Sequence, residues 1–153
     1  MIRITKQTDY GILLLTYFVQ GPKGWIWSAR ELAVESRLSL PMVSKILKLL
    51  TRNGLLASHR GVTGGYSLAQ QPEMISVAAI ISAMEGPIAM AECIGTPGDC
   101  RQEPICATRH NWHTINQAVR MALEGITLWD MSHPLSDDLV PLGGAQIEQS
   151  ITL

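Results

Sequence analysis

The sequence predicts a mainly α-helical fold with a small β-hairpin wing, in which a winged helix-turn-helix precedes one long C-terminal helix. Apolar residues recur at helical spacing in several segments of the 153-residue chain. Two short runs typical of strands flank a glycine-rich segment, residues 59–65, as expected for a hairpin. A further helical pattern begins near Cys106, after the segments that would already complete a small core.

The first helix is predicted from apolar residues at the i, i+3, i+4, i+7, i+8 spacing of an amphipathic helix. These residues are Tyr10, Leu13, Leu14, Tyr17 and Phe18. The Gly-Pro-Lys-Gly sequence of residues 21–24 forms a turn and ends this helix.

Two closely spaced helices follow. Ser28 and Glu31 form a capping-box pattern, which begins a short helix that runs to about Ser36. The next helix begins at Ser39, tolerates Pro41 in its first turn and ends at Asn53-Gly54. We expect its inner face to consist of Leu40, Val43, Ile46, Leu47 and Leu50.

The predicted hairpin pairs residues 55–58 with residues 66–68. Its tip contains three glycines, Gly61, Gly64 and Gly65, which we expect to adopt positive φ angles. Ser76 then caps another helix, which ends at Gly86-Pro87.

Residues 87–105 show neither the helical nor the strand spacing of apolar residues, which predicts an irregular loop that holds two of the three cysteines. The resulting organisation has four parts. Residues 1–86 form a winged-helix domain, 87–107 a cysteine-bearing loop, 108–132 a long helix and 133–153 a flexible tail.

The net charge of −1 conceals two oppositely charged halves. Residues 1–72 carry nine basic and three acidic residues, whereas residues 73–153 carry three basic and ten acidic residues. A polyanionic partner is therefore expected for the first half only. No apolar run reaches the roughly 18 residues of a membrane span, and no signal peptide opens the chain, so we expect a cytoplasmic protein without membrane contact. No catalytic constellation stands out, so we do not expect an enzyme.

The order of these elements is that of a winged helix-turn-helix, whose second helix enters the major groove of double-stranded DNA. Lysines on its outer face would meet phosphates, its first turn would reach base edges, and an arginine on the wing could enter a minor groove. The predicted DNA-binding residues are Lys6, Arg30, Ser39, Pro41, Ser44, Lys45, Lys48 and Arg60. The alternative is a protein that binds no DNA, in which these residues only face solvent.

The three cysteines and a histidine follow one another in the pattern C-x6-C-x5-C-x3-H: Cys93, Cys100, Cys106 and His110. An odd number of closely placed cysteines disfavours a disulfide framework and suits a soft metal, either an iron–sulfur cluster or zinc. The tight C-x2-C pairs common in structural zinc sites are missing, which favours the cluster. A zinc-containing regulator and a metal-free thiol-redox regulator remain alternatives, and His113 competes with His110.

Taken together, the sequence resembles the Rrf-type family of iron–sulfur winged-helix regulators, in which IscR and NsrR are found. The matching stretches are residues 4–11, 38–44, 49–55 and 60–66, the last reading Arg-Gly-Val-Thr-Gly-Gly-Tyr, together with the three cysteines and Trp112. The resemblance covers residues 1–132 and is closest to regulators of the Suf iron–sulfur assembly genes.

The resemblance implies a homodimer formed through the long C-terminal helix and binding to a promoter palindrome. It also implies a cluster, 2Fe-2S rather than 4Fe-4S, that is held by Cys93, Cys100 and Cys106 and sets DNA affinity. His110 is the favoured fourth ligand, and Asp9, which matches an N-terminal acidic ligand of some members, is the alternative. Repression of iron–sulfur assembly or related stress genes is the implied role.

Overall fold

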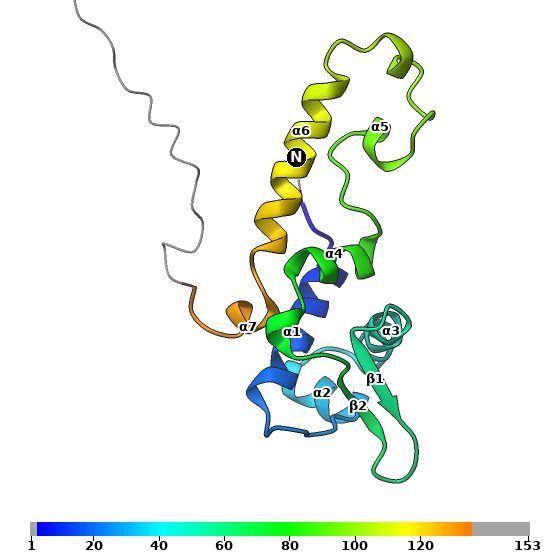
Figure 1. Cartoon of the computed structure of the whole chain (residues 1–153). Helices are drawn as coiled ribbons and strands as arrows, with labels where there is room; N and C mark the ends of the chain where they lie inside the picture. Colours follow the sequence, from blue (N-terminus) through cyan, green and yellow to red (C-terminus); the bar gives the residue numbers. More distant parts are fainter. Residues whose placement is uncertain (1–2, 136–153) are drawn as a thin grey trace, which may run out of the picture.

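The computed structural model describes residues 3–135, which form a helical body with a two-stranded hairpin on one side and a helix that extends away from it (Figure 1). The α-helices are α1 (Lys6–Gln20), α2 (Ala29–Ser36), α3 (Leu40–Arg52), α4 (Val77–Glu85), α5 (Glu92–Gly95), α6 (Arg109–Glu124) and α7 (Leu128–Met131). Strands β1 (Leu56–His59) and β2 (Gly65–Leu68) pair antiparallel, and two 3-10 turns, η1 (Pro72–Met74) and η2 (Glu103–Ile105), complete the order. The predicted mainly helical fold with a hairpin wing is confirmed.

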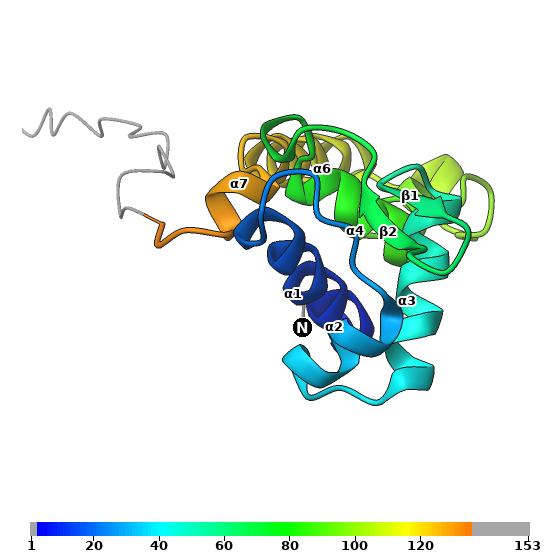
Figure 2. The same ribbon diagram turned by 90° about the horizontal axis from the view of Figure 1, so that it is seen from below.

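Helix α1 lies at the centre of the body, where α2, α3, α4 and α7 all contact it (Figure 2). The predicted apolar stripe is wrong at Leu13, which is 41% exposed. Because neighbours surround α1 on several sides, its buried face is wider than a single stripe and includes small and polar residues. The buried residues are Thr8, Gly11, Ile12, Leu14 and Leu15.

The capping box that begins α2 is confirmed. The Ser28 hydroxyl accepts the Glu31 N–H at 3.2 Å, and a Glu31 carboxylate oxygen accepts the Ser28 N–H at 2.8 Å. Helix α3 buries Val43, Ile46, Leu47 and Leu50 completely, as predicted. Leu40 was wrongly placed on that face, because the first residue of the helix projects beyond the core and is 39% exposed.

The hairpin forms with Leu56 opposite Leu68 and His59 opposite Gly65, so β1 starts and ends one residue later than predicted. The expectation that three glycines take positive φ is correct only at Gly61, where φ is 109°. Gly64 and Gly65 serve close packing instead. A Cβ on Gly64 would lie 2.5 Å from the His59 carbonyl oxygen, a separation that steric repulsion excludes.

Gly65 lets the hairpin approach the segment that precedes α2. Trp27 donates its N–H to the Tyr66 carbonyl at 2.9 Å and accepts the Tyr66 N–H at 2.8 Å, which adds a bridge alongside β2. A Cβ on Gly65 would lie less than 3.0 Å from the Trp27 carbonyl oxygen. The absence of a side chain at Gly65 therefore allows the wing to join the helical body.

We expect Gly65→Ala to lower the free energy of unfolding by about 1–3 kcal/mol, because Trp27 and β2 must separate to admit the methyl group. Chemical denaturation measures this change. Gly125→Ala is the matched control, because φ at Gly125 is −75° and the nearest atom to its added Cβ lies 3.5 Å away. Equal stability of the two variants would contradict the assigned role of Gly65.

The single helix expected through residue 132 is not found, because α6 ends at Glu124 and the chain then returns to the body. Val77 donates its N–H to the Ile126 carbonyl at 2.8 Å, and Leu128 donates to the Ile75 carbonyl at 2.7 Å. Leu128 is fully buried in the core. Both ends of α6 are thus linked to other parts of the protein, one to the core and the other to the cysteine-bearing loop.

Glu85, the last residue of α4, joins this helix to the beginning of α1. One carboxylate oxygen accepts the Thr5 N–H at 2.8 Å and the hydroxyl of the buried Thr8. The hydroxyl of Thr8 and the N–H of Thr5, in that order, hold the pKa of Glu85 below its usual range. Since Gly86 follows immediately, this contact fixes the point from which the cysteine-bearing loop departs.

A lowered pKa makes the contribution of Glu85 to stability dependent on pH. Its carboxylate stabilises the fold above the unfolded-state pKa of about 4.3, and this contribution is lost as pH falls through the lower folded-state pKa. We expect Glu85→Gln to lower stability by about 1 kcal/mol at pH 7 and by less at pH 3, as measured by thermal unfolding at each pH. Thr8→Ser keeps the hydroxyl, so its stability should depend on pH in the same way as that of the wild type. Parallel profiles of stability against pH for Glu85→Gln and wild type would contradict this assignment.

The predicted tail comprises residues 133–153. Its first three residues, His133, Pro134 and Leu135, belong to the described part of the chain, and the rest of it lies outside the described residues. Among residues 3–135, no helix combines the length and the apolar character needed to cross a membrane.

Candidate DNA-binding surface and cysteine loop

The outer face of α3 presents the side chains expected of a recognition helix. Pro41, Lys45 and Lys48 are exposed, and Ser44 is half-buried among them. Ser39 is the N-cap residue of α3 and has an extended backbone, but its side chain makes no hydrogen bond to the first turn of the helix. Its exposed hydroxyl therefore remains able to bind another group. The ammonium groups of the two lysines and the hydroxyls of the two serines can donate hydrogen bonds to phosphates and base edges, whereas Pro41 can make only van der Waals contacts.

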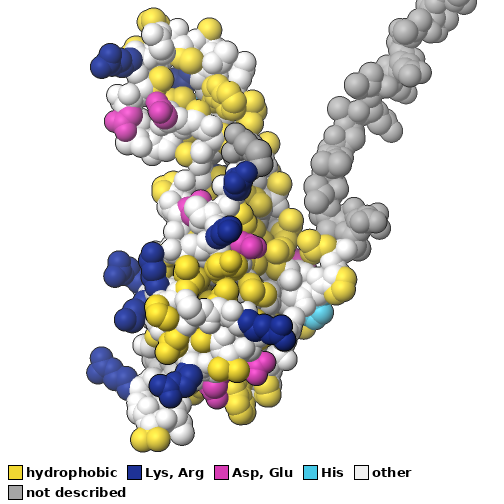
Figure 3. Space-filling view, turned by 180° about the vertical axis from the view of Figure 1, so that it is seen from behind, with side chains coloured by type: hydrophobic (Ala, Val, Ile, Leu, Met, Phe, Trp, Pro, Cys, Tyr) yellow, Lys and Arg dark blue, Asp and Glu magenta, His cyan; other side chains and the backbone are white. Residues whose placement is uncertain are grey.

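The remaining predicted DNA contacts lie on the other elements of the winged helix. Arg30 is exposed in the first turn of α2, Arg60 is exposed on the hairpin, and Lys6 is exposed at the start of α1. Lysine and arginine side chains gather along the edge of the molecule that carries α3 and the hairpin (Figure 3). The ion pairs found among residues 3–135 involve none of these predicted residues, which leaves their charges available to a polyanion.

Arg37 is a candidate contact that the sequence did not indicate. It ends α2 with a left-handed backbone, φ 56° and ψ 27°, and its side chain is exposed in the turn just before α3. Glycine is the residue that this conformation favours, so an arginine here carries a conformational cost. The charge lies beside the first turn of the recognition helix, where a phosphate contact would offset that cost.

Residues 86–108 form the cysteine loop, which connects α4 to α6. The expected irregular segment contains two short helical turns, α5 and η2. Cys93 lies in α5 and is 7% exposed, whereas Cys100 and Cys106 are partly exposed farther along the loop. One thiol is therefore fixed by packing, and the other two lie nearer the surface.

Glu103 organises the second half of the cysteine loop. Its side chain is 9% exposed, accepts the Gly98 N–H at 2.7 Å and pairs with the Arg109 guanidinium at 2.8 Å. A buried carboxylate is stable only when it is paired or hydrogen-bonded, and Glu103 is both. This contact ties the segment between Cys100 and Cys106 to the first residue of α6.

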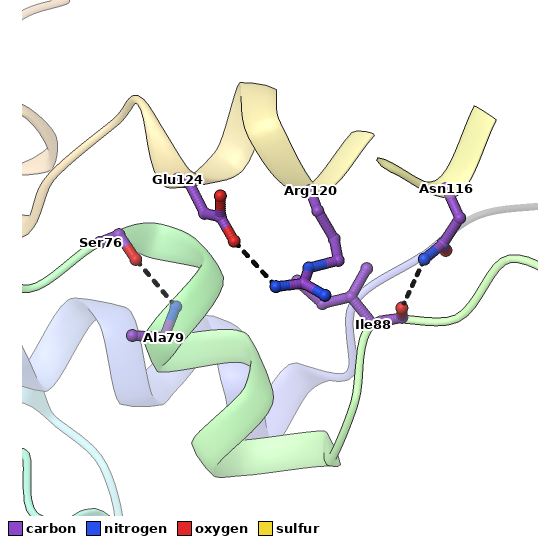
Figure 4. Close-up of polar contacts among 6 residues, drawn as sticks. All are labelled: Ser76, Ala79, Ile88, Asn116, Arg120 and Glu124. Atoms are coloured by element: carbon purple, nitrogen blue, oxygen red, sulfur yellow. Dashed lines mark hydrogen bonds and ion pairs between the residues drawn. The ribbon is translucent and has the colours of Figure 1, made fainter. Parts of the chain in front are cut away.

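Asn116 holds the first half of the cysteine loop against α6. Its side-chain oxygen accepts the Met90 N–H at 3.0 Å, and its side-chain nitrogen donates to the Ile88 carbonyl at 3.1 Å, the second contact being drawn in Figure 4. Sequence reasoning missed both Asn116 and Glu103, because a polar residue within a helix or loop is ordinarily expected to face solvent.

Cys106 differs chemically from an ordinary thiol. Its sulfur lies 3.4 Å from the Thr108 hydroxyl, and hydrogen bonding by Thr108 is the main cause that lowers the pKa of Cys106. The nearby Arg109 contributes through a backbone hydrogen bond and through its charge. The thiolate, which is the form that binds metals and reacts with oxidants, is thereby favoured.

The structure does not bring the predicted metal ligands together. Among residues 3–135, no three side chains of His, Cys, Asp or Glu lie close enough to hold a metal ion. His110 is exposed in the first turn of α6, and Asp9 is exposed in the first turn of α1. The three thiols fit an iron–sulfur cluster or zinc by their chemistry, but binding in this way requires the cysteine loop to close.

Comparison with known proteins identifies the family. The Rrf2 family, described as an iron-dependent transcriptional regulator, matches residues 4–134. The chain belongs to the Rrf2 family. The resemblance inferred from the sequence motifs is thereby confirmed at the level of the family.

Relatives and solved structures agree with this assignment. NsrR of Halalkalibacterium halodurans is 29% identical over 131 residues, which cover 85% of this chain and 90% of that protein. CymR, the global cysteine regulator of B. subtilis, is 29% identical with a TM-score of 0.68 and covers 86% of this chain and 97% of its own. IscR of T. potens is 26% identical with a TM-score of 0.64, and the match covers 85% of each chain.

These matches establish the general activity. The protein is a DNA-binding transcriptional regulator with a winged helix, and not an enzyme. The exposed face of α3 and the basic side chains around it are accordingly the candidate DNA-binding surface.

Proposed function

We propose that the protein is an iron–sulfur-sensing regulator in which the state of the cysteine loop sets the affinity for promoter DNA. The observation that carries this proposal is the placement of all three cysteines within residues 93–106, on the one segment that links the winged helix to α6. The description of the family as iron-dependent supports the choice of metal. The cluster would be 2Fe-2S, bound by Cys93, Cys100 and Cys106 with His110 or Asp9 as the fourth ligand.

The groups that would perform this function belong to three connected parts of the chain, namely the cysteine loop, α6 and the winged helix. A bound iron–sulfur cluster would supply a group that is lost or oxidised when iron or redox conditions change. Cys100 and Cys106 must approach the buried Cys93, so the loop around Glu103 must change its contacts. The resulting change reaches the DNA-binding surface, and repression of iron–sulfur assembly or related stress genes is the proposed outcome.

We infer that the regulator acts as a homodimer on a palindromic site. Helix α6 carries two large apolar side chains, Trp112 and Ile115, that lie three residues apart on one face of the helix and that the single chain leaves exposed. A second copy packed on this face would cover them and would place two recognition helices on one duplex.

Ile115→Asp should convert such a dimer to a monomer, because it places an unpaired charge in the apolar interface. Sedimentation equilibrium measures the mass of both proteins. Arg120→Ala on the same helix is the control, since this exposed side chain pairs only with Glu124 of its own helix in the described chain. A wild type that sediments as a monomer would refute the dimer.

The experiment that tests the sensor is a visible absorption spectrum of protein purified without oxygen, together with iron and sulfide assays. A coloured protein with about stoichiometric iron and sulfide, whose DNA affinity changes when the cluster is removed, supports the proposal. A colourless protein that contains zinc, or that binds no metal after reconstitution, would remove the iron–sulfur mechanism and leave the DNA-binding regulator intact.

The lowered pKa and partial exposure of Cys106 favour one alternative, a metal-free thiol sensor. In this case the Cys106 thiolate would attack hydrogen peroxide, forming an S–O bond as the O–O bond breaks, to give sulfenic acid and hydroxide. Metal-free protein would then change its DNA affinity on exposure to peroxide, and Cys106→Ala would not. The iron–sulfur sensor predicts no such response from the metal-free wild type.

A further inference from the structure

We propose that Asn116 is the positioning residue that transmits the state of the cysteine loop to α6, and thereby to the DNA-binding surface. This inference rests on the proposed function and assigns the regulation of the same site. It concerns a residue that lies outside the candidate DNA-binding surface and is not among the predicted metal ligands.

Asn116 differs from the other residues of its helix. Most side chains of α6 are exposed, whereas Asn116 is 6% exposed and is the buried residue of this helix. A buried carboxamide must satisfy both its acceptor and its donor, since an unpaired polar group is costly away from water. Asn116 does so with the backbone of residues 88–90 alone.

The two hydrogen bonds of Asn116 act together as a clamp. The Met90 N–H and the Ile88 carbonyl point toward the same side chain, at 3.0 and 3.1 Å, so the segment is held as it would be by a neighbouring strand. Aspartate could accept from Met90 but could not donate to Ile88, and leucine could do neither. The contact therefore requires an asparagine rather than any residue of similar size.

The position of the clamp along the chain connects it to the thiols. Met90 precedes the buried Cys93 by three residues, a separation of at most about 10 Å in an extended chain. At the other end of the loop, Glu103 binds Arg109 at the start of α6. The cysteine loop is thus attached to α6 on both sides of Cys100, and closure of the loop around a cluster must act on this helix.

The route from α6 to the DNA-binding domain is also present in the structure. Helix α6 packs against α4 and continues into the segment whose Ile126 and Leu128 bond to the backbone beside α4. Helix α4 in turn contacts α1 and α3. A shift of α6 is consequently passed to the helix that presents Lys45 and Lys48.

The test compares the wild type with Asn116→Leu, Asn116→Asp and the control Gln117→Ala, an exposed neighbour on α6. Hydrogen exchange of the Met90 amide in metal-free protein reports the clamp itself. We expect both Asn116 variants to take up the cluster. In Asn116→Leu the amide should exchange at least about tenfold faster than in wild type, because its acceptor is gone. Gln117→Ala should match the wild type.

The decisive quantity is the ratio of DNA affinities of the cluster-loaded and cluster-free forms. For a regulator this ratio is typically about 5- to 150-fold, and we expect it to fall toward 1 in both Asn116 variants. If Asn116→Leu fails to fold, Asn116→Asp, which keeps the side-chain volume, decides in its place. Visible circular dichroism of the loaded forms verifies that the cluster is bound in each protein.

The outcomes separate this inference from the proposed function. A wild type with no cluster, or with equal DNA affinity in both forms, would refute the sensor itself. A wild type with a large ratio that the folded Asn116 variants retain would overturn the role of Asn116. Loss of cluster uptake in these variants would also overturn it, because Asn116 would then build the site rather than transmit its state.

Discussion

Replacement of both lysines on the outer face of α3, Lys45→Glu with Lys48→Glu, is expected to weaken binding to promoter DNA by about 100-fold. Both side chains are exposed and project from the face opposite the buried residues of this helix. Each would lose a phosphate contact and introduce repulsion, so affinity falls for every DNA sequence. The fold is retained, because neither side chain contributes to the core.

The dependence of binding on salt identifies the cause of this loss. Each phosphate contact contributes about 0.9 to the slope of log affinity against log salt concentration, so the double variant should lose about 1.8. Fluorescence anisotropy with labelled DNA at several salt concentrations measures both quantities. Lys23→Glu, an exposed lysine outside the predicted surface, is compared with each single reversal on α3. Equal losses from Lys23→Glu and Lys45→Glu would show a general charge effect and contradict the assignment of α3.

The parts of the fold that could be predicted depend on neighbouring residues in the sequence. The capping box of Ser28 and Glu31 requires only a spacing of three residues. The inner face of α3 follows from helical periodicity, which places Val43 and Leu47 on one side. Leu13 and Leu40 fit the same period, but their exposure depends on where the neighbouring helices end, which no local pattern contains.

Contacts between distant segments explain most of the remaining differences. Gly65 was expected to supply a positive φ, whereas it admits the backbone of Trp27, which lies almost forty residues earlier in the chain. The apolar period after Cys106 suggested one long helix, yet Leu128 returns to the core and pairs with Ile75. Periodicity gives the face of a helix but not the partner that covers it.

The candidate site was predicted unevenly for a similar reason. The exposed residues of α3 follow directly from the fold, since the outer face of a packed helix is the face that remains. The cysteine spacing indicates a class of ligand, but the arrangement of the thiols depends on contacts such as those of Glu103 and Asn116. These polar groups are buried by the loop that they hold, so their role is visible only in the folded chain.

Cys93→Ala is expected to abolish cluster binding and, with it, the response of DNA binding to iron. Cys93 is the buried thiol of the cysteine loop, three residues beyond the backbone segment that Asn116 holds. A ligand in a fixed position can anchor the cluster while Cys100 and Cys106 approach from the partly exposed part of the loop. Iron and sulfide should fall to background, and the visible absorption should disappear.

The DNA affinity of Cys93→Ala should then be the same before and after reconstitution, in place of the change of about 5- to 150-fold expected for the wild type. Removal of one buried sulfur should cost only about 1 kcal/mol of stability, so the folded variant remains measurable. Thr96→Ala, an exposed substitution in the same loop, is the matched control and should respond as the wild type does.

A Cys93→Ala protein that remains coloured would show that Cys93 packs α5 and does not bind the cluster. A colourless variant with an unchanged response would separate regulation from the metal and favour the thiol of Cys106, whose lowered pKa already suits reaction with an oxidant.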